Sequence, residues 1–286
     1  MVTSEMHGMA TLGAAWHDAG RRIDRLDARL LLEHVCGCTQ ADLIAHPERV
    51  LTTDQTTRFA ALLARREAGE PLAYLLGSAF FCGLEFAVSP VVLIPRPETE
   101  VLVKQAEAQV RKLAAPRIVD MGTGSGIVAI LLAGRCPAAD VTAVDMSSAA
   151  LEMARHNAER HSVSVRFVEG DWYSPLGDER FDLIVSNPPY VAAGDPHLQQ
   201  NGLPFEPQMA LTDAVVGGSG LTCIRTLIEG AGSHLSPAGW LMIEHGDDQA
   251  VQVRELLRAN GFVGVDSWRD EAGIERVSGG FVDSVR

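Results

Sequence analysis

The sequence lacks a long hydrophobic run, a secretory signal and an excess of positive charge. None of its 286 residues lies in an apolar stretch of membrane-spanning length, and residues 1–20 do not show the basic-then-apolar pattern of a signal peptide. Lys and Arg number 24 against 37 Asp and Glu, so the formal net charge is −13. Proteins that grip nucleic acid through its phosphates normally present a basic face. We therefore expect a cytoplasmic protein that binds neither membranes nor, directly, nucleic acid.

Cysteine is scarce and forms no metal-binding pattern. Cys36 and Cys38 are separated by one residue, which is not the common zinc spacing, and nearby His34 and His46 are better explained as ordinary core or surface residues. The five cysteines, an odd number, are Cys36, Cys38, Cys82, Cys136 and Cys223. We expect reduced, mostly buried thiols and no metal.

Hydrophobic residues make up 47% of the chain, which is enough for one or two globular domains with a sizeable core. Residues 1–76 show helical spacing, and Thr52 with Gln55 fits a capping box that opens one of the helices. We predict an N-terminal helical domain at 1–76 that recognises the substrate. Residues 77–94 predict a connecting hairpin, and residues 95–286 form the second domain.

From residue 117 the chain alternates strand and helix, which predicts an α/β fold with a doubly wound, mostly parallel sheet. Seven strands are expected, at 117–121, 141–144, 163–168, 181–186, 240–244, 262–268 and 275–281. Helices are expected at about 126–135, 147–161, 220–234 and 247–260. Residues 191–219 are expected to form one long loop, of a length that is usually functional or disordered.

A glycine-rich turn joins the first strand of this sheet to the first helix. It consists of Gly122, Thr123, Gly124, Ser125 and Gly126, whose glycines let the backbone approach a ligand closely. A dinucleotide-binding fingerprint needs a further glycine at the position of Ile127, which disfavours an oxidoreductase. The turn alone is weak evidence for any one ligand.

Acidic residues follow the next two strands. Asp145 ends the second strand, where a carboxylate accepts hydrogen bonds from ribose hydroxyls in doubly wound folds, although a helix cap is the commoner role. Asp171 and Trp172 follow the third strand. Asp171 suits an adenine amino group and Trp172 suits its ring, while a turn residue and a core aromatic are the ordinary alternatives.

Asn187, Pro188, Pro189 and Tyr190 end the fourth strand. Two prolines stop the strand, and in an open α/β sheet ligands bind at the carboxyl ends of the strands. An amide side chain with backbone carbonyls beside it suits a planar NH2 group, such as that of glutamine or adenine. A proline-rich loop without function is the alternative for this motif alone. Four such features at one edge of one sheet are unlikely to coincide by chance.

This ordered set resembles the class I S-adenosylmethionine-dependent methyltransferases and, more narrowly, the release factor glutamine methyltransferases of the HemK/PrmC type. The resemblance covers nearly the whole chain and is carried by Glu70 to Tyr74, Ile94-Pro95-Arg96-Pro97-Glu98-Thr99-Glu100, Asp120 to Gly126, Val185 to Tyr190, Asp195 to Gln200, Phe205-Glu206-Pro207 and Glu244-His245-Gly246. The chain departs from the family at Ser278-Gly279-Gly280, where two glycines leave the register of the last strand open.

The resemblance implies that S-adenosylmethionine, without a metal, is the methyl donor. It implies that Gly122 to Gly126, Asp145, Asp171, Trp172 and Asn187 surround this donor. Asn187 to Tyr190 would hold the acceptor, the glutamine of a Gly-Gly-Gln motif in class-1 peptide chain release factors.

For catalysis, we expect Asn187 Oδ1 and the Pro188 carbonyl each to accept one N–H of the substrate amide, while Tyr190 packs on the flat amide. Two alternatives remain: an adenine amino-methyltransferase acting on nucleic acid, and a non-catalytic binding protein on the same fold.

Overall fold

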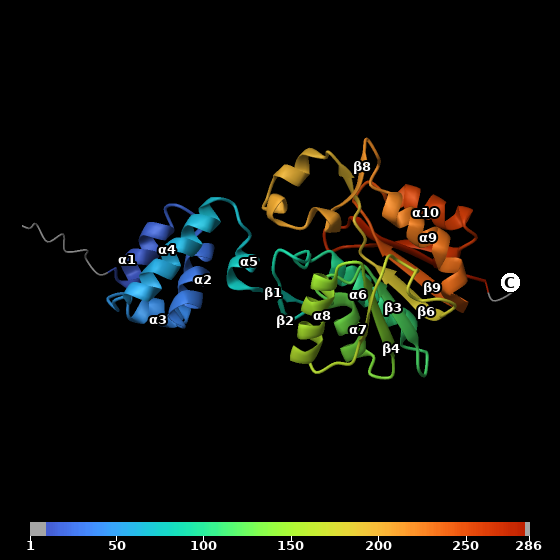
Figure 1. Ribbon diagram of the computed structural model, residues 1–286, viewed down its shortest axis with the longest axis horizontal. Coiled ribbons are helices and arrows are strands. Elements are labelled where there is room, and N and C mark those ends of the chain that lie inside the picture. Colours follow the sequence, from blue (N-terminus) through green and yellow to red (C-terminus); the bar gives the residue numbers. More distant parts are fainter. Residues whose placement is uncertain (1–9, 284–286) are drawn as a thin grey trace, which may run out of the picture. The chain divides into compact units, whose positions relative to one another are not determined.

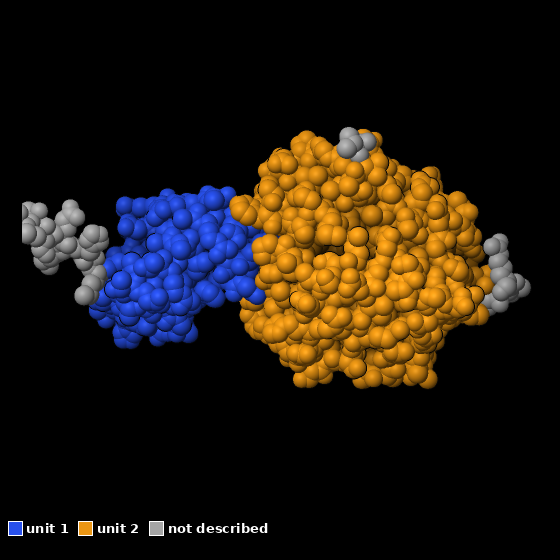
Figure 2. Space-filling model, in the orientation of Figure 1, with its two compact units in different colours: residues 1–77 blue, residues 78–286 orange. Residues whose placement is uncertain are grey.

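The computed structural model describes residues 10–283, in two compact units at residues 1–77 and 78–286 (Figure 2). The ends of the predicted domains, residues 1–9 and 284–286, lie outside the described residues. Between residues 10 and 283, no helix is long and apolar enough to cross a membrane.

The first unit is helical, as its spacing predicted. Its helices enclose a core of its own that includes Leu31, Leu32, Phe59 and Leu63. The predicted capping box at Thr52 is confirmed, because Thr52 Oγ1 accepts from the Gln55 N–H and the Gln55 side chain accepts from the Thr52 N–H. The helices are α1 (Leu12–Ala19), α2 (Arg25–Cys36), α3 (Gln40–Ala45), α4 (Thr53–Glu67) and α5 (Leu72–Leu76).

The second unit opens with the predicted hairpin, formed by β1 (Ser78–Phe81) and β2 (Leu84–Ala87). Asn157, on a later helix, forms two hydrogen bonds with the last residue of the hairpin. Its Oδ1 accepts from the Ala87 N–H at 2.7 Å, and its Nδ2 donates to the Ala87 carbonyl at 3.0 Å. These two bonds fix the end of β2 to that helix.

The main sheet has seven strands within the described residues, which confirms the predicted fold class. Its order is β10-β11-β9-β6-β3-β4-β5; β11 pairs antiparallel with both β10 and β9, and the other pairs are parallel. The strands are β3 (Arg117–Met121), β4 (Asp140–Asp145), β5 (Arg166–Glu169), β6 (Phe181–Ser186), β9 (Leu235–Glu244), β10 (Val263–Arg269) and β11 (Glu275–Phe281). The chain order reverses between β3 and β6, which is where a doubly wound sheet opens a crevice for ligands.

Helices cover both faces of this sheet (Figure 1). Alternate residues of one strand serve the two faces. Leu183 and Val185 of β6 pack in the core beneath the first group of helices, while Ile184 packs beneath the second group. The first group is α6 (Thr99–Val110), α7 (Ile127–Arg135) and α8 (Ser148–Arg160), and the second is α9 (Thr222–His234) and α10 (Ala250–Ala259).

Residues 191–219 differ from the single loop expected. They contain a short parallel pair, β7 (Val191–Ala193) with β8 (Thr212–Val216), and three 3₁₀ turns, η1 (Pro196–Gln199), η2 (Leu203–Phe205) and η3 (Gln208–Ala210). Such short strands carry little periodic signal, so sequence patterns miss them.

The last strand explains the two glycines at the chain's departure from the family pattern. β11 pairs with β9 in unbroken register from Val277, opposite Glu244, to Phe281, opposite Trp240. A Cβ at Gly279 would lie 2.6 Å from the Leu241 carbonyl oxygen, and one at Gly280 would lie 3.0 Å from Val265 Cγ2. Close packing against β9 therefore requires Gly279, and it leaves little room for a side chain at Gly280.

Candidate active site

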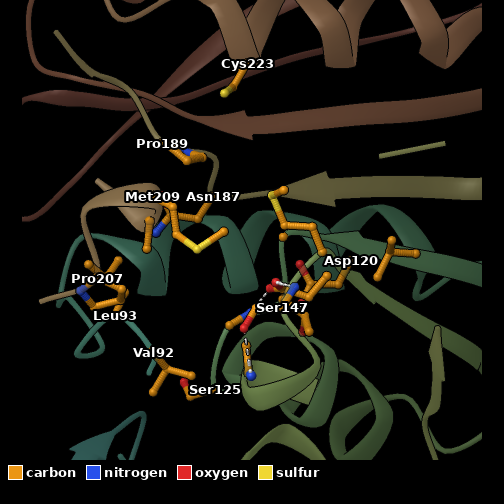
Figure 3. A pocket seen from close by; sticks show the side chains of 18 of the residues that line it. Val92, Leu93, Asp120, Ser125, Ser147, Asn187, Pro189, Pro207, Met209 and Cys223 are labelled. Carbon is orange, nitrogen blue, oxygen red and sulfur yellow. Dashed lines mark hydrogen bonds between the residues drawn. The ribbon is translucent and has the colours of Figure 1, made fainter. Parts of the chain in front are cut away.

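A cavity of about 400 Å³ lies in the second unit, at the carboxyl ends of β3, β4 and β6. This volume falls within the range of small-molecule sites. Figure 3 shows Asp120, Ser125 and Ser147 on one side of the cavity, and Asn187, Pro207 and Met209 on another. Its lining is mostly apolar with a few polar groups, as expected of a site that binds a ligand partly through its rings.

The glycine turn after β3 forms one wall. Gly122 and Gly124 have φ of +73° and +56°, and a Cβ at Gly124 would meet no atom within 4 Å. The backbone there faces open space and is accessible to a ligand. Thr123 and Ser125 also line the cavity.

Gly126 has a different task from the other two glycines. It is not among the residues that line the cavity but is the N-cap of α7, with φ of +85°. A Cβ there would lie 3.0 Å from Ala154 Cβ of α8, so the glycine allows α7 and α8 to pack closely. Its assignment to the cofactor site stays a prediction.

Asp120 is a cavity residue for which no local sequence pattern predicted a separate role. Its side chain is buried at the end of β3, and its Oδ2 accepts from the Thr123 hydroxyl at 2.6 Å. Burial, with a smaller contribution from the nearby Asp145, raises its pKa to about 7 against the lowering effect of the hydrogen bonds from Thr123 and the Ala129 N–H. A carboxylate near the carboxyl end of a mostly apolar strand was the available signal.

Asp145 lines the cavity at the end of β4. Its Oδ2 accepts from the Gly124 N–H at 2.8 Å and its Oδ1 accepts from the Ser147 N–H at 2.9 Å. Burial raises the pKa of this carboxyl, against the lowering effect of these backbone donors. Asp145 therefore shapes the glycine turn while keeping lone pairs for a ligand.

Asp171 and Trp172 also line the cavity, beyond the end of β5. Asp171 is exposed, and Trp172 is half-buried with φ of +44°, a conformation that an aromatic residue rarely adopts. Trp172 packs beside the glycine turn, because a Cβ at Gly122 would lie 3.7 Å from its ring. The structure thus brings the acid, the ring and the turn together.

Asn187 and Pro189 line the cavity beyond the end of β6, whereas Pro188 is buried and Tyr190 is turned towards the core. Asn187 Nδ2 donates to Thr99 Oγ1 at 3.2 Å. Among residues 10–283, no group donates a hydrogen bond to Asn187 Oδ1. That oxygen is therefore available to a ligand.

Tyr190 is fixed at both its side chain and its backbone. Its hydroxyl donates to Glu244 Oε1 at 3.3 Å, and burial raises the pKa of this phenol. Its carbonyl accepts from Gln249 Nε2 at 3.0 Å. These contacts hold the motif after β6 rigidly in place, and packing of Tyr190 on a substrate amide stays a prediction.

Two further segments line the cavity, residues 91–96 and parts of 207–214. The buried Glu206 joins them: its Oε1 accepts from Arg96 Nη2 at 2.5 Å, and its Oε2 accepts from the Ile94 N–H at 3.1 Å. Both segments carried part of the family resemblance, but no local pattern signalled that they would meet.

The described part of the chain contains no group of three or more His, Cys, Asp or Glu side chains arranged to hold a metal ion. The cysteines in residues 10–283 are free thiols, and burial raises the pKa of each.

Comparison with known proteins gives close relatives over most of the chain. Residues 14–77 match the PrmC N-terminal domain, and residues 97–201 match the Methyltransferase small domain. The chain is 49% identical over 261 residues to the release factor glutamine methyltransferase of Bordetella pertussis, covering 91% of this chain and 96% of the relative. It is 43% identical over 257 residues to that of Salmonella typhimurium, covering 90% and 91%.

Solved structures confirm the predicted methyltransferase fold. A methyltransferase from Pyrococcus furiosus has a TM-score of 0.52 at 21% identity, covering 81% of this chain and 100% of that chain. The hMettl16 catalytic domain in complex with MAT2A 3'UTR hairpin 6 has a TM-score of 0.55 at 17% identity, covering 81% and 82%. At these identities the likeness concerns the fold alone.

Proposed function

The chain belongs to the release factor glutamine methyltransferase family, and we propose that it methylates the side-chain amide nitrogen of a glutamine in class-1 peptide chain release factors. S-adenosylmethionine is the proposed methyl donor, and the glutamine of a Gly-Gly-Gln motif is the proposed acceptor. One observation carries the chemistry: Asn187, with Oδ1 free of donors in the described chain, follows β6 beside the glycine turn that follows β3.

The cavity fits S-adenosylmethionine in size and in the groups that it offers. A volume of about 400 Å³ suits a nucleoside with an amino-acid side arm. The turn from Gly122 to Ser125 offers open backbone, Asp145 offers acceptors to ribose hydroxyls, and Asp171 with Trp172 suits the adenine. When bound, S-adenosylmethionine supplies a methyl group activated by its sulfonium sulfur.

The protein must orient a poor nucleophile, because the lone pair of an amide nitrogen is delocalised into its carbonyl. Asn187 Oδ1 and the Pro188 carbonyl would each accept one N–H of the glutamine. These two bonds turn the nitrogen towards the methyl group and stabilise the positive charge that develops on it. One such preorganised partner contributes about 2.7–4 kcal/mol to lowering the barrier. The methylated amide is acidic and releases its proton without a strong base.

An adenine amino-methyltransferase is the alternative enzyme, since adenine also presents a planar NH2 group beside an sp² carbon. Polynucleotide substrates bring phosphates, which a chain of net charge −13 repels outside local basic patches. A glutamine on a protein loop meets no such repulsion. A non-catalytic binding protein is disfavoured because it would not need a free amide oxygen at this edge of the sheet.

The decisive test is transfer of labelled methyl from S-adenosylmethionine to a purified class-1 release factor, located by peptide mass spectrometry. We expect label on the glutamine of the Gly-Gly-Gln motif and none when that glutamine is replaced. Asn187→Ala should lower kcat about a hundredfold or more while cofactor affinity falls much less. Label in adenine of a nucleic-acid fraction, with none in the release factor, would overturn the proposal.

A further inference from the structure

The direction of the Pro188 carbonyl decides whether it can accept an N–H of the substrate amide, and this inference rests on the proposed function. The motif from Asn187 to Tyr190 begins where β6 is held in the sheet, with Ser186 paired opposite Met121. Each proline ring fixes its own φ, and a proline also restricts the residue before it. The motif is therefore a stiff segment, whose orientation depends on what holds its two ends.

Gln249 holds the far end of this segment. It is the N-cap residue of α10 and is only 6% exposed. Its Nε2 donates to the Tyr190 carbonyl at 3.0 Å and to the Ser219 carbonyl at 2.9 Å, and its Oε1 accepts from the Gly246 N–H at 2.8 Å. The opposite orientation of this amide would place its NH2 against an N–H group and its oxygen against two carbonyls. One side chain therefore joins the motif after β6, the end of the 191–219 segment and the loop after β9.

His245 fixes Gly246, whose N–H is the donor to Gln249. The His245 Nδ1 lies 2.8 Å from the Gly246 carbonyl oxygen, which can only accept, so Nδ1 carries a proton. The Nε2 of the same ring lies 2.8 Å from Ser278 Oγ. Burial lowers the pKa of His245, so the ring is neutral and its Nε2 accepts from the Ser278 hydroxyl. The surroundings of this buried histidine thus define its tautomer.

The other end of this chain of hydrogen bonds requires the same direction. Ser278 Oγ lies 2.7 Å from Ser267 Oγ, which accepts from Arg254 Nη1 at 2.6 Å. Because the Ser278 proton goes to His245, the Ser267 hydroxyl donates to Ser278. A guanidinium, which only donates, completes the chain. Arg254 lies on α10, the helix that begins after Gln249, so the chain returns to the element from which it started.

We propose that Gln249 is a positioning residue for methyl transfer. By holding the Tyr190 backbone, it keeps the Asn187 amide and the Pro188 carbonyl directed towards the substrate. The hydrogen-bond chain through His245 holds the partner of Gln249 in the loop after β9. Gln249 is not among the residues that line the cavity, so its loss should lower kcat and change cofactor affinity little. A residue that only stabilises the fold would lower stability and leave the kcat of the folded chain unchanged.

Gln249→Glu and Gln249→Met test this role, because both keep the length of the side chain. The ionised carboxylate can still accept from Gly246 but presents oxygen to two carbonyls, whereas the protonated acid can donate to one of them. Burial favours the protonated form as the pH falls. Relative to wild type, we expect the kcat of Gln249→Glu to be about tenfold lower or more at about pH 8.5, and to recover partly at about pH 6. Gln249→Met, which cannot donate at either pH, should stay about tenfold below wild type at both.

Gln252→Glu is the matched control, since it adds the same charge at an exposed position of the same helix. Its kcat should stay within about twofold of wild type at both pH values. Methyl transfer to the release factor by the full-length chain gives kcat and KM. Calorimetry gives the S-adenosylmethionine Kd, which should stay within about twofold of wild type in every variant. Urea unfolding at both pH values shows that each chain is folded.

The outcomes separate this inference from the proposed function. A wild-type chain that does not label the glutamine contradicts the proposed function itself. With an active wild type, a folded Gln249→Met whose kcat equals that of wild type overturns the inference, and so does a cofactor Kd that weakens as much as kcat falls. A relative kcat of Gln249→Glu that is the same at both pH values also contradicts it. If Gln249→Glu does not fold, Gln249→Met still decides, because it buries no charge.

Discussion

Asp145 fixes the glycine turn, and we propose that the same carboxylate also holds the cofactor ribose. Its oxygens accept from the N–H groups of Gly124 and Ser147, which fixes the glycine turn, and its place at the end of β4 is where a ribose would be held. A residue with both tasks should affect cofactor affinity strongly, because its loss removes a ligand contact and loosens the turn.

We therefore expect Asp145→Ala to weaken S-adenosylmethionine binding at least about tenfold, equivalent to about 1.4 kcal/mol for a charge-assisted hydrogen bond. Calorimetric titration of the full-length chain measures this. Asp140→Ala is the matched control, because it removes an equal charge from an exposed position at the start of the same strand. Affinity unchanged in Asp145→Ala would remove this carboxylate from the site.

Asp120 leads to a prediction about pH. Burial raises the pKa of its carboxyl from about 3.8 to about 7, so the folded chain binds this proton over a range where the unfolded chain has lost it. The stability that this group contributes is complete below about pH 4 and is lost as the pH rises through 7. The expected slope is about 1.4 kcal/mol of unfolding free energy per pH unit between these limits.

Asp120→Asn should remove this contribution. Urea unfolding at pH 5 and pH 7 should show a decline in stability that is smaller in the variant than in the wild type by about 2–3 kcal/mol. Thr123 and the Ala129 N–H lower this pKa and Asp145 raises it, so Asp145→Asn is a useful comparison. Equal declines in the Asp120→Asn variant and the wild type would show that Asp120 does not titrate in this range.

The site residues that the sequence identified are marked by their position along a strand, whereas those that it missed are marked only by long-range contacts. Asp145 and Asn187 were identifiable because one ends a strand and the other directly follows one, and ligands bind at the carboxyl ends of strands in an open α/β sheet. Glu206 contacts Arg96 across 110 residues, and Thr99 contacts Asn187 across 88. Their roles depend on contacts that no local spacing encodes.

At the scale of elements, hydrophobic pattern located every strand of the main sheet but not all of the limits, since β9 begins at Leu235 rather than at 240. β3 and β6 have the predicted limits, because each is an apolar run buried on both faces. β5 begins at Arg166 rather than at 163, and the pair β7 and β8 was missed. Tertiary contacts hold these short strands, and they bury too little for a periodic signal.

Gly220 packs against the motif after β6 and so holds the end of the 191–219 segment in place. Its φ is +72°, and a Cβ there would lie 2.1 Å from the Tyr190 carbonyl oxygen. Gln249 reinforces the junction by donating to the carbonyls of both Tyr190 and Ser219. The backbone of Tyr190, and with it Asn187, therefore depends on this glycine.

Gly220→Ala should lower both thermal stability and methyl transfer, because the new methyl group displaces the Tyr190 backbone. Gly217→Ala is the matched control, since Gly217 has a similar φ of +73° but a Cβ there would meet no atom within 4 Å. The control should lose only about 1–2 kcal/mol of stability for its left-handed backbone and keep its kcat. Equal kcat values for the two variants would contradict the proposed contact.

At the scale of the whole molecule, each of the two units has a hydrophobic core of its own, but the cavity belongs to the second unit. The first unit has its own core around Leu31 and Phe59, and the second has two cores on the faces of its sheet. All residues that line the main cavity, from Val91 to Cys223, belong to the second unit. Helical spacing and the capping box at Thr52 predicted a helical domain before the sheet, but its role in substrate recognition stays a prediction.

A chain of residues 78–286 tests that role. We expect this chain to fold alone, because it contains both hydrophobic cores of the second unit. Its cavity is complete, so it should bind S-adenosylmethionine with an affinity close to that of the full chain. Methyl transfer to the release factor should be lost, because the truncated chain keeps the chemistry but lacks the surface that we expect to dock the protein substrate. Calorimetry with the cofactor shows that the truncated chain is folded, so that lost activity can be assigned to substrate recognition. Transfer to the release factor at the full chain's rate would show instead that residues 78–286 recognise the substrate unaided.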